Sequence, residues 1–183
     1  MSAITGDLGV SPGTSITGIP RGEPDGINHA DDAVSDQAHF EATMAYNALM
    51  VPACDDMRAT GQLGGLVLSP GVHCFDTEAV HLEGPLVLDA EGDPDARFVF
   101  RVRAAFTTGS FASVTMADGA PPCGVYWLVG TSATVGEGSL FAGTILAKDA
   151  ITLSPGARLT GRALARNAAL TMDSNSVSVA LCD

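Results

Sequence analysis

Three threonines recur at nearly constant spacing in the last third of the chain. They are Thr134, Thr152 and Thr171, in the segments SATVGEG, AITLSPG and AALTMDS, and they lie 18 and 19 residues apart. Each stands between two apolar residues and is followed by turn residues, a pattern typical of a short strand with one buried face. Self-similarity at this period indicates a solenoid of stacked coils. The apolar neighbours then point inward, so the threonines form an outward row of hydroxyl and methyl groups at a spacing of roughly 4.7–4.9 Å.

An acidic run, DAEGDPDAR, has the alternating spacing of a calcium-binding loop. Its carboxylates are Asp89, Glu91, Asp93 and Asp95. The downstream glutamate of such a loop is missing, and Gly92 falls at position 4 of the loop instead of position 6. We therefore interpret this run as a solvated turn.

The histidines do not form a metal-binding pair. His29 and His39 lie ten residues apart on one predicted helix, so they point to different sides of it. His73, next to Cys74, is interpreted as a loop residue. The sequence has no recognisable phosphate loop, nucleophile elbow or Cys/His pair with a supporting acid. We expect no enzymatic activity, no cofactor and no bound metal.

Four cysteines, Cys54, Cys74, Cys123 and Cys182, form an even set without a Cys-x-x-Cys pair. Zinc is therefore not expected, which leaves disulfides or buried thiols. Three pairings are possible. We favour Cys54–Cys74, which would bracket one loop, and Cys123–Cys182, which would tie the C-terminus to a mid-chain strand. These bonds would place the protein outside the cytoplasm, with its export signal already removed.

Composition excludes several classes of partner. The chain has 183 residues, a net charge of −12 and a single lysine, Lys148. A nucleic acid or an anionic membrane would require a basic patch, so neither is expected. No apolar run reaches the roughly 18–20 residues that span a bilayer. Length and the lack of a low-complexity linker predict a single domain over residues 1–183.

The periodicity changes from strand to helix and back along the chain. Strands are predicted over residues 4–19 and 65–182, with a helix over about residues 28–50, N-capped by Asn28. The predicted packing stripe of this helix is rich in alanine. It comprises Ala30, Val34, Ala38, Ala45 and Leu49, with Ala42 at its edge.

Two strands allow a prediction of which side chains point inward. In GVYWLVG, we expect Val125, Trp127 and Val129 to point in, leaving Tyr126 and Leu128 to be covered by the helix.

In RFVFRVR, the face with Val99, Arg101 and Arg103 is predicted to be charged and solvated. The turn Ser-Pro-Gly, which occurs at residues 11–13, 69–71 and 154–156, extends the repeat toward the N-terminus.

Several of these motifs together resemble the microbial ice-binding (antifreeze) protein family. They are ITGDLGVSPGTSITG, the helix ending ATMAYNAL, the run GDPDARFVF, the segment CGVYWLVGTSATVGEGSLFAGTILA, and LTGRALARNAALTMD. The resemblance covers nearly the whole chain, with several motifs in the same order and spacing. It implies a mainly β protein, a right-handed discontinuous β-solenoid of triangular cross-section with one long α-helix packed alongside. It also implies that coil order does not follow sequence order.

The same resemblance implies an exported, monomeric protein that binds ice crystals through one flat, solvent-facing β-sheet. Carried over by position, that face runs through the threonine row and through the residues two positions earlier. The expected face comprises Ser15, Thr17, Ala79, His81, Ala105, Thr107, Ser132, Thr134, Ala150, Thr152, Ala169 and Thr171. The register of the N-terminal part is open, because SPGTSITG also aligns on SPGARLTG, which would pair Thr17 with Thr160.

Two features depart from the family pattern. A strand segment that usually precedes ITGDLG is absent from this sequence. His81 stands where a small hydroxylated residue is usual, with Glu83 and Asp173 at the margin of the face. These departures leave a second hypothesis, an extracellular structural or adhesion module that has kept the fold with little or no ice activity.

Overall fold

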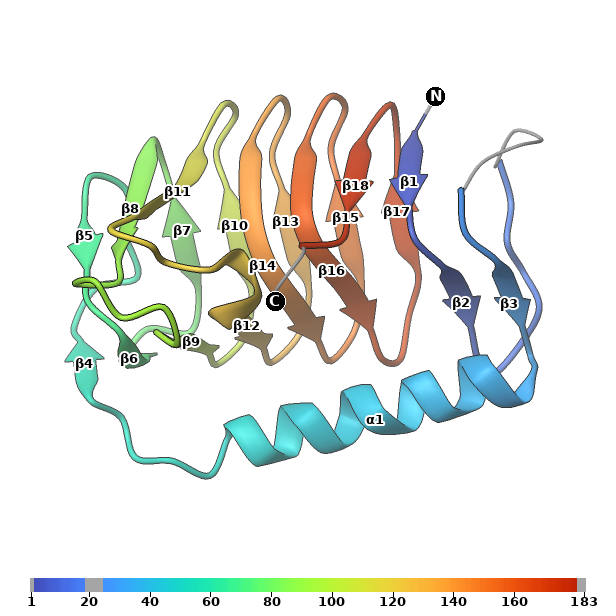
Figure 1. The fold of residues 1–183 in the computed structure, drawn as a ribbon, viewed down its shortest axis with the longest axis horizontal. Coiled ribbons are helices and arrows are strands. Elements are labelled where there is room, and N and C mark those ends of the chain that lie inside the picture. The colour runs from blue at the N-terminus through green and yellow to red at the C-terminus, as the bar shows by residue number, and fades with distance from the viewer. Residues whose placement is uncertain (1, 19–24, 181–183) are drawn as a thin grey trace.

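Short parallel strands, stacked coil upon coil, make up most of the computed structural model, which describes residues 2–18 and 25–180 (Figure 1). The strands line three faces of a solenoid. One sheet is β7 (Val80–Leu82), β10 (Phe106–Thr108), β13 (Ala133–Val135), β15 (Ile151–Leu153) and β17 (Leu170–Met172), which we call the threonine sheet.

A larger sheet bends across the other two faces. Its helix-covered side contains β4 (Asp56–Arg58), β6 (Gly71–Phe75), β9 (Phe98–Val102), β12 (Val125–Val129) and the second halves of β14 (Leu140–Ala147) and β16 (Arg158–Ala165). Its other side, the third face, contains β1 (Ala3–Thr5), β5 (Val67–Leu68), β8 (Pro85–Asp89), β11 (Ser113–Ala117), β18 (Ser176–Ser178) and the first halves of β14 and β16. The long strands β14 and β16 turn the corner between these two faces, with Gly143 paired to Gly161 as their sequence similarity indicates.

The order of coils in space differs from their order in the chain, as expected. The first strand, β1, pairs in parallel with the last one, β18. Beyond it, β2 (Leu8–Val10) pairs with β3 (Asn28–Ala30). The helix α1 (Ala33–Leu49) then runs the length of the solenoid to β4, from which the coils build back to β18 (Figure 1). The strand prediction therefore missed β4, and it placed strand structure after Val10, where the described residues up to 18 form none.

The core is built around stacked aromatic rings. Trp127 is fully buried, and its ring stacks on Phe100 with a centroid distance of 4.0 Å. Phe106 and Phe141 pack against the same indole at 4.9 Å each. The indole Nε1 donates a hydrogen bond to the carbonyl oxygen of Ala142, so the one polar atom of the ring is satisfied. Val125 and Val129 are also fully buried, which confirms the predicted inward set.

The helix begins later than the sequence predicted. Residues 28–30 form β3, Asp31 follows with a φ of 54°, and the N-cap is Asp32 instead of Asn28. The Asp32 carboxylate accepts hydrogen bonds from the backbone N–H of Val34 and Ser35, while the Asp32 N–H donates to the Ser35 hydroxyl. This reciprocal capping box fixes the start of the helix at Ala33. His29, which was predicted to lie in the helix, belongs to β3 instead.

The packing face of the helix also differs from the predicted stripe. Ser35 and Ala42 are buried. Val34 is 54% exposed, and Ala38 and Ala45 are exposed as well. The buried side carries polar groups that a count of apolar residues overlooks. Its contacts are the His39 Nε2–Arg166 carbonyl hydrogen bond, the Arg166 Nε–Thr43 hydroxyl hydrogen bond, and the Arg166 guanidinium lying 4.8 Å from the Tyr46 ring centroid.

The predicted solvated face of RFVFRVR is wrong for two of its three residues. Val99 is buried, and Arg101 donates hydrogen bonds from Nε and Nη2 to the carbonyl oxygen of Leu49 at 3.1 and 2.7 Å. Arg101 thereby satisfies an otherwise unpaired carbonyl at the helix C-terminus. Desolvation by burial lowers the pKa of Arg101, and the Asp55 carboxylate partly offsets that shift. Only Arg103 is exposed as predicted.

The predicted Cys54–Cys74 disulfide is confirmed, with an S–S distance of 2.01 Å. It ties the segment after the helix to β6. Cys123 is also disulfide-bonded, and Cys182, its expected partner, lies outside the described residues. Within residues 2–18 and 25–180, no helix is long and apolar enough to cross a membrane.

Candidate functional site

The three threonines predicted from the repeats lie in register across the threonine sheet, together with Thr107, which the family resemblance implied. Thr107 pairs with Thr134, Thr134 with Thr152, and Thr152 with Thr171. His81 of β7 pairs with Thr107 and continues the row. Because neighbouring parallel strands lie about 4.7–4.9 Å apart, the row presents one side chain per coil at a nearly constant interval.

Alternation along each strand directs this row to the solvent. On the central strands, the residues flanking each threonine are buried, as with Phe106 and Thr108 around Thr107. Thr107, Thr134 and Thr152 are half-buried, because neighbouring side chains in the row cover their flanks, and Thr171 is exposed. The core therefore fixes the row from beneath and leaves its hydroxyl and methyl groups outside.

Two further rows flank the threonines on the same face. The backbone N–H groups of Val80, Phe106, Ala133 and Ile151 donate to the carbonyl oxygens of Ala105, Ser132, Ala150 and Ala169, respectively, which aligns the residues two positions before each threonine. That row is Ala79, Ala105, Ser132, Ala150 and Ala169, as predicted. On the other side lie Glu83, Gly109, Gly136, Ser154 and Asp173.

The middle of this surface contains only small, uncharged side chains. On β10, β13 and β15, the three rows consist of Ala105, Thr107 and Gly109; Ser132, Thr134 and Gly136; and Ala150, Thr152 and Ser154. The carboxylates of the surface stand at its two ends, Glu83 beside β7 and Asp173 beside β17. Gly109, Gly136 and Ser154 were not predicted, although the repeat carries their signal two residues after each threonine.

The β7 end of the surface is less regular than its middle. His81 is exposed, and Gln62 forms an isolated parallel bridge with it. The Gln62 Oε1 accepts hydrogen bonds from the backbone N–H of Gly64 and of Glu83. Gln62 was missed at the sequence level, because a single bridging residue shows no strand periodicity.

Ser15 and Thr17 are not joined to the threonine sheet in the described structure. Both are exposed and belong to a segment without strand pairing. Thr160, the alternative partner considered for Thr17, pairs instead with Ser178 on the third face.

Within the described residues, no group of three or more His, Cys, Asp or Glu side chains could hold a metal ion. In the acidic run, Asp89 accepts a hydrogen bond from the N–H of Glu91, and Asp93 accepts one from the N–H of Asp95, as in a turn.

His73 is not the loop residue that was predicted. It lies in β6, 4% exposed, between the Asp56 carboxylate and the Ser69 carbonyl.

Fold and surface together define a class: a β-solenoid that carries a helix on one face and leaves bare, on another, a sheet whose centre has only small, uncharged side chains. Comparison with known proteins agrees with this class. The sequence model described as Ice-binding-like matches residues 1–178, so the chain belongs to this family.

The relatives and solved structures that resemble the chain include the following three. The chain is 45% identical to an ice-binding protein of Nostoc sp. over 97% of its own length, and it spans 65% of the length of that relative. An ice-binding protein of Leucosporidium sp. is 31% identical over 90% of this chain and 70% of the relative. The crystal structure of an ice-binding protein from the Antarctic ascomycete Antarctomyces psychrotrophicus superposes with a TM-score of 0.90, at 35% identity over 99% of this chain and 88% of that one.

Proposed function

We propose that this protein adsorbs to ice through the threonine sheet and thereby inhibits ice growth or recrystallisation, without catalysing a reaction. The observation that carries the proposal is the in-register row of His81, Thr107, Thr134, Thr152 and Thr171, flanked at its centre by alanine, serine and glycine. The relatives named as ice-binding proteins favour this function over an extracellular structural or adhesion module.

The surface fits the chemistry of ice. An ice surface offers ordered water molecules and no net charge, so a protein face that matches it must be flat, rigid and uncharged. Threonine suits this role because its χ1 is restricted, its methyl group is apolar and its hydroxyl can both donate and accept. Stacking of the coils holds the strands flatter than an open twisted sheet. Weak contacts repeated over many equivalent sites then add up to strong adsorption.

The partner in this proposal is the ordered water of an ice crystal, and no nucleic acid, membrane or cofactor takes part. The protein acts as an exported monomer. The Cys54–Cys74 bond supports export, because structural disulfides persist in oxidising compartments.

The test is a bulky substitution in the centre of the sheet. Thr152→Tyr should abolish adsorption, because a phenol ring standing above the plane keeps the surrounding rows away from ice. A matched control is available in the same coil: Thr160 is an exposed threonine of β16 on the third face. Thr160→Tyr should bind ice as the wild type does.

Adsorption is measured by growing a polycrystalline ice hemisphere in dilute, fluorescently labelled protein. Bright patches with the wild type and with Thr160→Tyr, and a dark hemisphere with folded Thr152→Tyr, are the expected results. A dark hemisphere with folded wild-type protein would overturn the proposed function, and equal brightness of both variants would move the site to another face.

A further inference from the structure

The turns between the threonine sheet and the third face share one backbone feature. Each contains a residue with positive φ, between 54° and 82°, three or four positions after the outward row. These residues are Gly65, Gly84, Phe111, Gly138, Gly156 and Ser174. A positive φ is uncommon for residues with a side chain, and glycine adopts it without steric cost.

Phe111 is the exception in this series. It has a φ of 58° at a position where the other turns have glycine or serine. For a bulky residue this conformation is a true outlier. The side chain does not recover the cost by burial, because it is 75% exposed. The turn therefore keeps an exposed aromatic ring at a site where the backbone favours glycine.

The neighbouring coil holds the backbone of Phe111 and lies beneath its ring. The Phe111 N–H donates a hydrogen bond to the carbonyl oxygen of Glu137 at 2.8 Å. A Cβ atom on Gly138 would lie 2.5 Å from Cε1 and 2.7 Å from Cδ1 of the Phe111 ring. The ring thus lies over Gly138, in space that a side chain at position 138 would fill.

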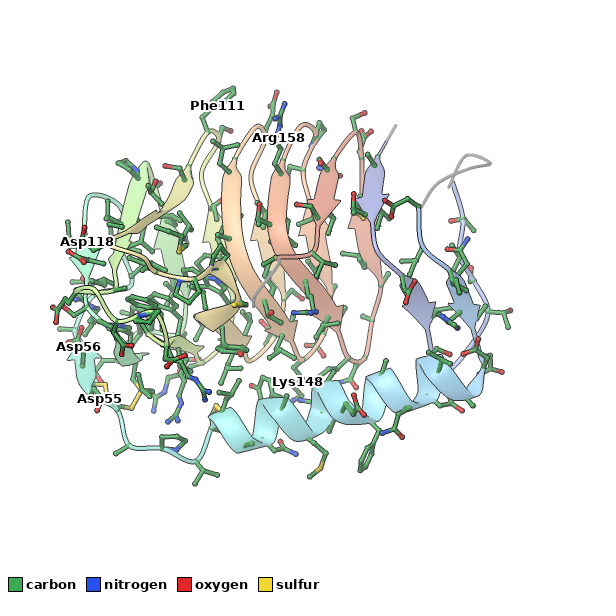
Figure 2. The ribbon with its side chains drawn as sticks, in the orientation of Figure 1. Asp55, Asp56, Phe111, Asp118, Lys148 and Arg158 are labelled. Carbon is green, nitrogen blue, oxygen red and sulfur yellow. A yellow bond between two sulfur atoms is a disulfide. The ribbon has the colours of Figure 1, made fainter. Side chains whose placement is uncertain are left out.

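The place of the ring in the fold links it to the threonine sheet. Phe111 follows β10 directly, four residues after Thr107, and projects outward from the corner where the sheet meets the third face (Figure 2). Leu140, 54% exposed, follows Gly138 in the next coil and pairs with Ser113. Two exposed apolar side chains therefore stand at this corner of the sheet, next to the exposed Glu137 and Arg158.

We propose that Phe111 is an ice-contacting residue that extends the binding surface of the threonine sheet over its corner. This inference rests on the proposed function. An uncharged ring over Gly138 orders the water at its surface, as the small side chains of the sheet do, and brings no charge that competes for that water. A protein partner fits less well, because a stable interface buries about 800 Å² on each side, far more than two side chains offer.

The test separates the ring from the strain that it causes. Phe111→Gly removes the ring and relieves the backbone. Its melting temperature should equal or exceed that of the wild type, by up to about 2–4 °C. The protein concentration for half-maximal inhibition of ice recrystallisation should rise by about 5-fold or more. A factor of about 5 in an equilibrium ratio corresponds to the loss of about 1 kcal/mol of interaction free energy.

Two controls isolate the cause. Ser174→Gly relieves the same backbone conformation in another turn without removing a ring, and it should inhibit recrystallisation as the wild type does. Phe40→Ala removes a phenylalanine that is 60% exposed on the outer side of the helix, and it too should leave inhibition unchanged. If Phe111→Gly fails to fold, Phe111→Asn replaces it, because asparagine tolerates the left-handed conformation.

The outcomes distinguish this inference from the proposed function. If the wild type, Ser174→Gly and folded Phe111→Gly all inhibit equally, Phe111 does not contact ice and the inference is wrong, while ice binding by the threonine sheet stands. A variant that loses stability but keeps inhibition gives the ring a structural role only and likewise overturns the inference. A wild type without any ice activity overturns both.

Discussion

The helix-covered face and the threonine sheet are built from the same coils, yet one is covered and the other is bare. Both carry an outward row with one residue per coil in strict register. On the covered face, the row is Cys74, Arg101, Leu128, Leu146 and Leu164; on the bare face, it is His81, Thr107, Thr134, Thr152 and Thr171. The backbone geometry is therefore equal, and the side chains make the difference.

Size and polarity of the outward side chains decide which face is covered. Leu128 and Leu146 leave only 0 and 1% of their surface exposed, because Ala42, Tyr46 and Leu49 of the helix region pack on them. Burial of a leucine contributes roughly 1.5–3 kcal/mol, so a bare row of leucines would be costly. Threonine, alanine and glycine expose little apolar surface, and a sheet made of them can stay bare. The small size of the outward residues at the centre of this sheet is therefore what allows the face to stay uncovered.

The largest effect expected from this comparison concerns stability. Leu128→Ala should reduce the free energy of unfolding by about 2–5 kcal/mol, because it removes buried atoms between sheet and helix and leaves a cavity. Thr134→Ala, in the following strand of the same coil, should change it by less than about 1 kcal/mol. Urea unfolding of both variants gives these values. Similar losses for both would mean that the two faces do not differ as described.

A smaller effect concerns the cap that starts the covering helix. The backbone N–H of Ser35, and next the His29 side chain, hold the pKa of Asp32 below its usual value of 3.8. A lowered pKa in the folded state means that this stabilisation is present above pH 3.8 and is lost as the pH falls through the folded-state pKa. Asp32→Ala should therefore melt at a lower temperature than the wild type at neutral pH, and the difference should shrink below pH 3.8.

A control for this prediction keeps the cap and removes the charge. Asp32→Asn retains an oxygen that accepts the backbone hydrogen bonds, so it should melt close to the wild type at neutral pH and lack the pH dependence. Thermal melts followed by circular dichroism across this pH range provide the comparison. A constant difference between Asp32→Ala and wild type at all pH values would contradict the assigned role of the carboxylate.

The smallest effect on stability, and a gain of function, is expected at the irregular end of the bare row. His81→Thr would lengthen the uniform row by one coil, and because His81 is exposed, the free energy of unfolding should change by no more than about 0.5 kcal/mol. Thermal hysteresis should increase, since one more equivalent contact joins the surface. A decrease in hysteresis with unchanged stability would show that the imidazole itself contributes to binding.

The sequence predicted the candidate surface better than it predicted the helix. Thr134, Thr152 and Thr171 were found in register as expected, since each threonine and its buried neighbours form a repeat that one strand carries by itself. Thr107, expected from the family resemblance, continues their row. Ser15 and Thr17, which have only half of that pattern, stand outside the sheet. Gln62 gave no periodic signal and became part of the row only through its bridge to His81.

The features that followed from the sequence alone are therefore local: alternation within strands, turn positions and the inward Trp127. The sequence left three cysteine pairings open, and the structure shows Cys54 bonded to Cys74. What the tertiary structure decided depends on residues far apart in the chain. The pairing of β3 with β2 takes residues 28–30 out of the helix, and contacts such as that of His39 with Arg166, 127 residues away, determine which side of the helix packs on the solenoid. Likewise, the guanidinium of Arg101 lies against the helix end, because it donates hydrogen bonds to the carbonyl of Leu49, 52 residues away. Periodicity reports which way a side chain points, and only the assembled coils determine what lies opposite it.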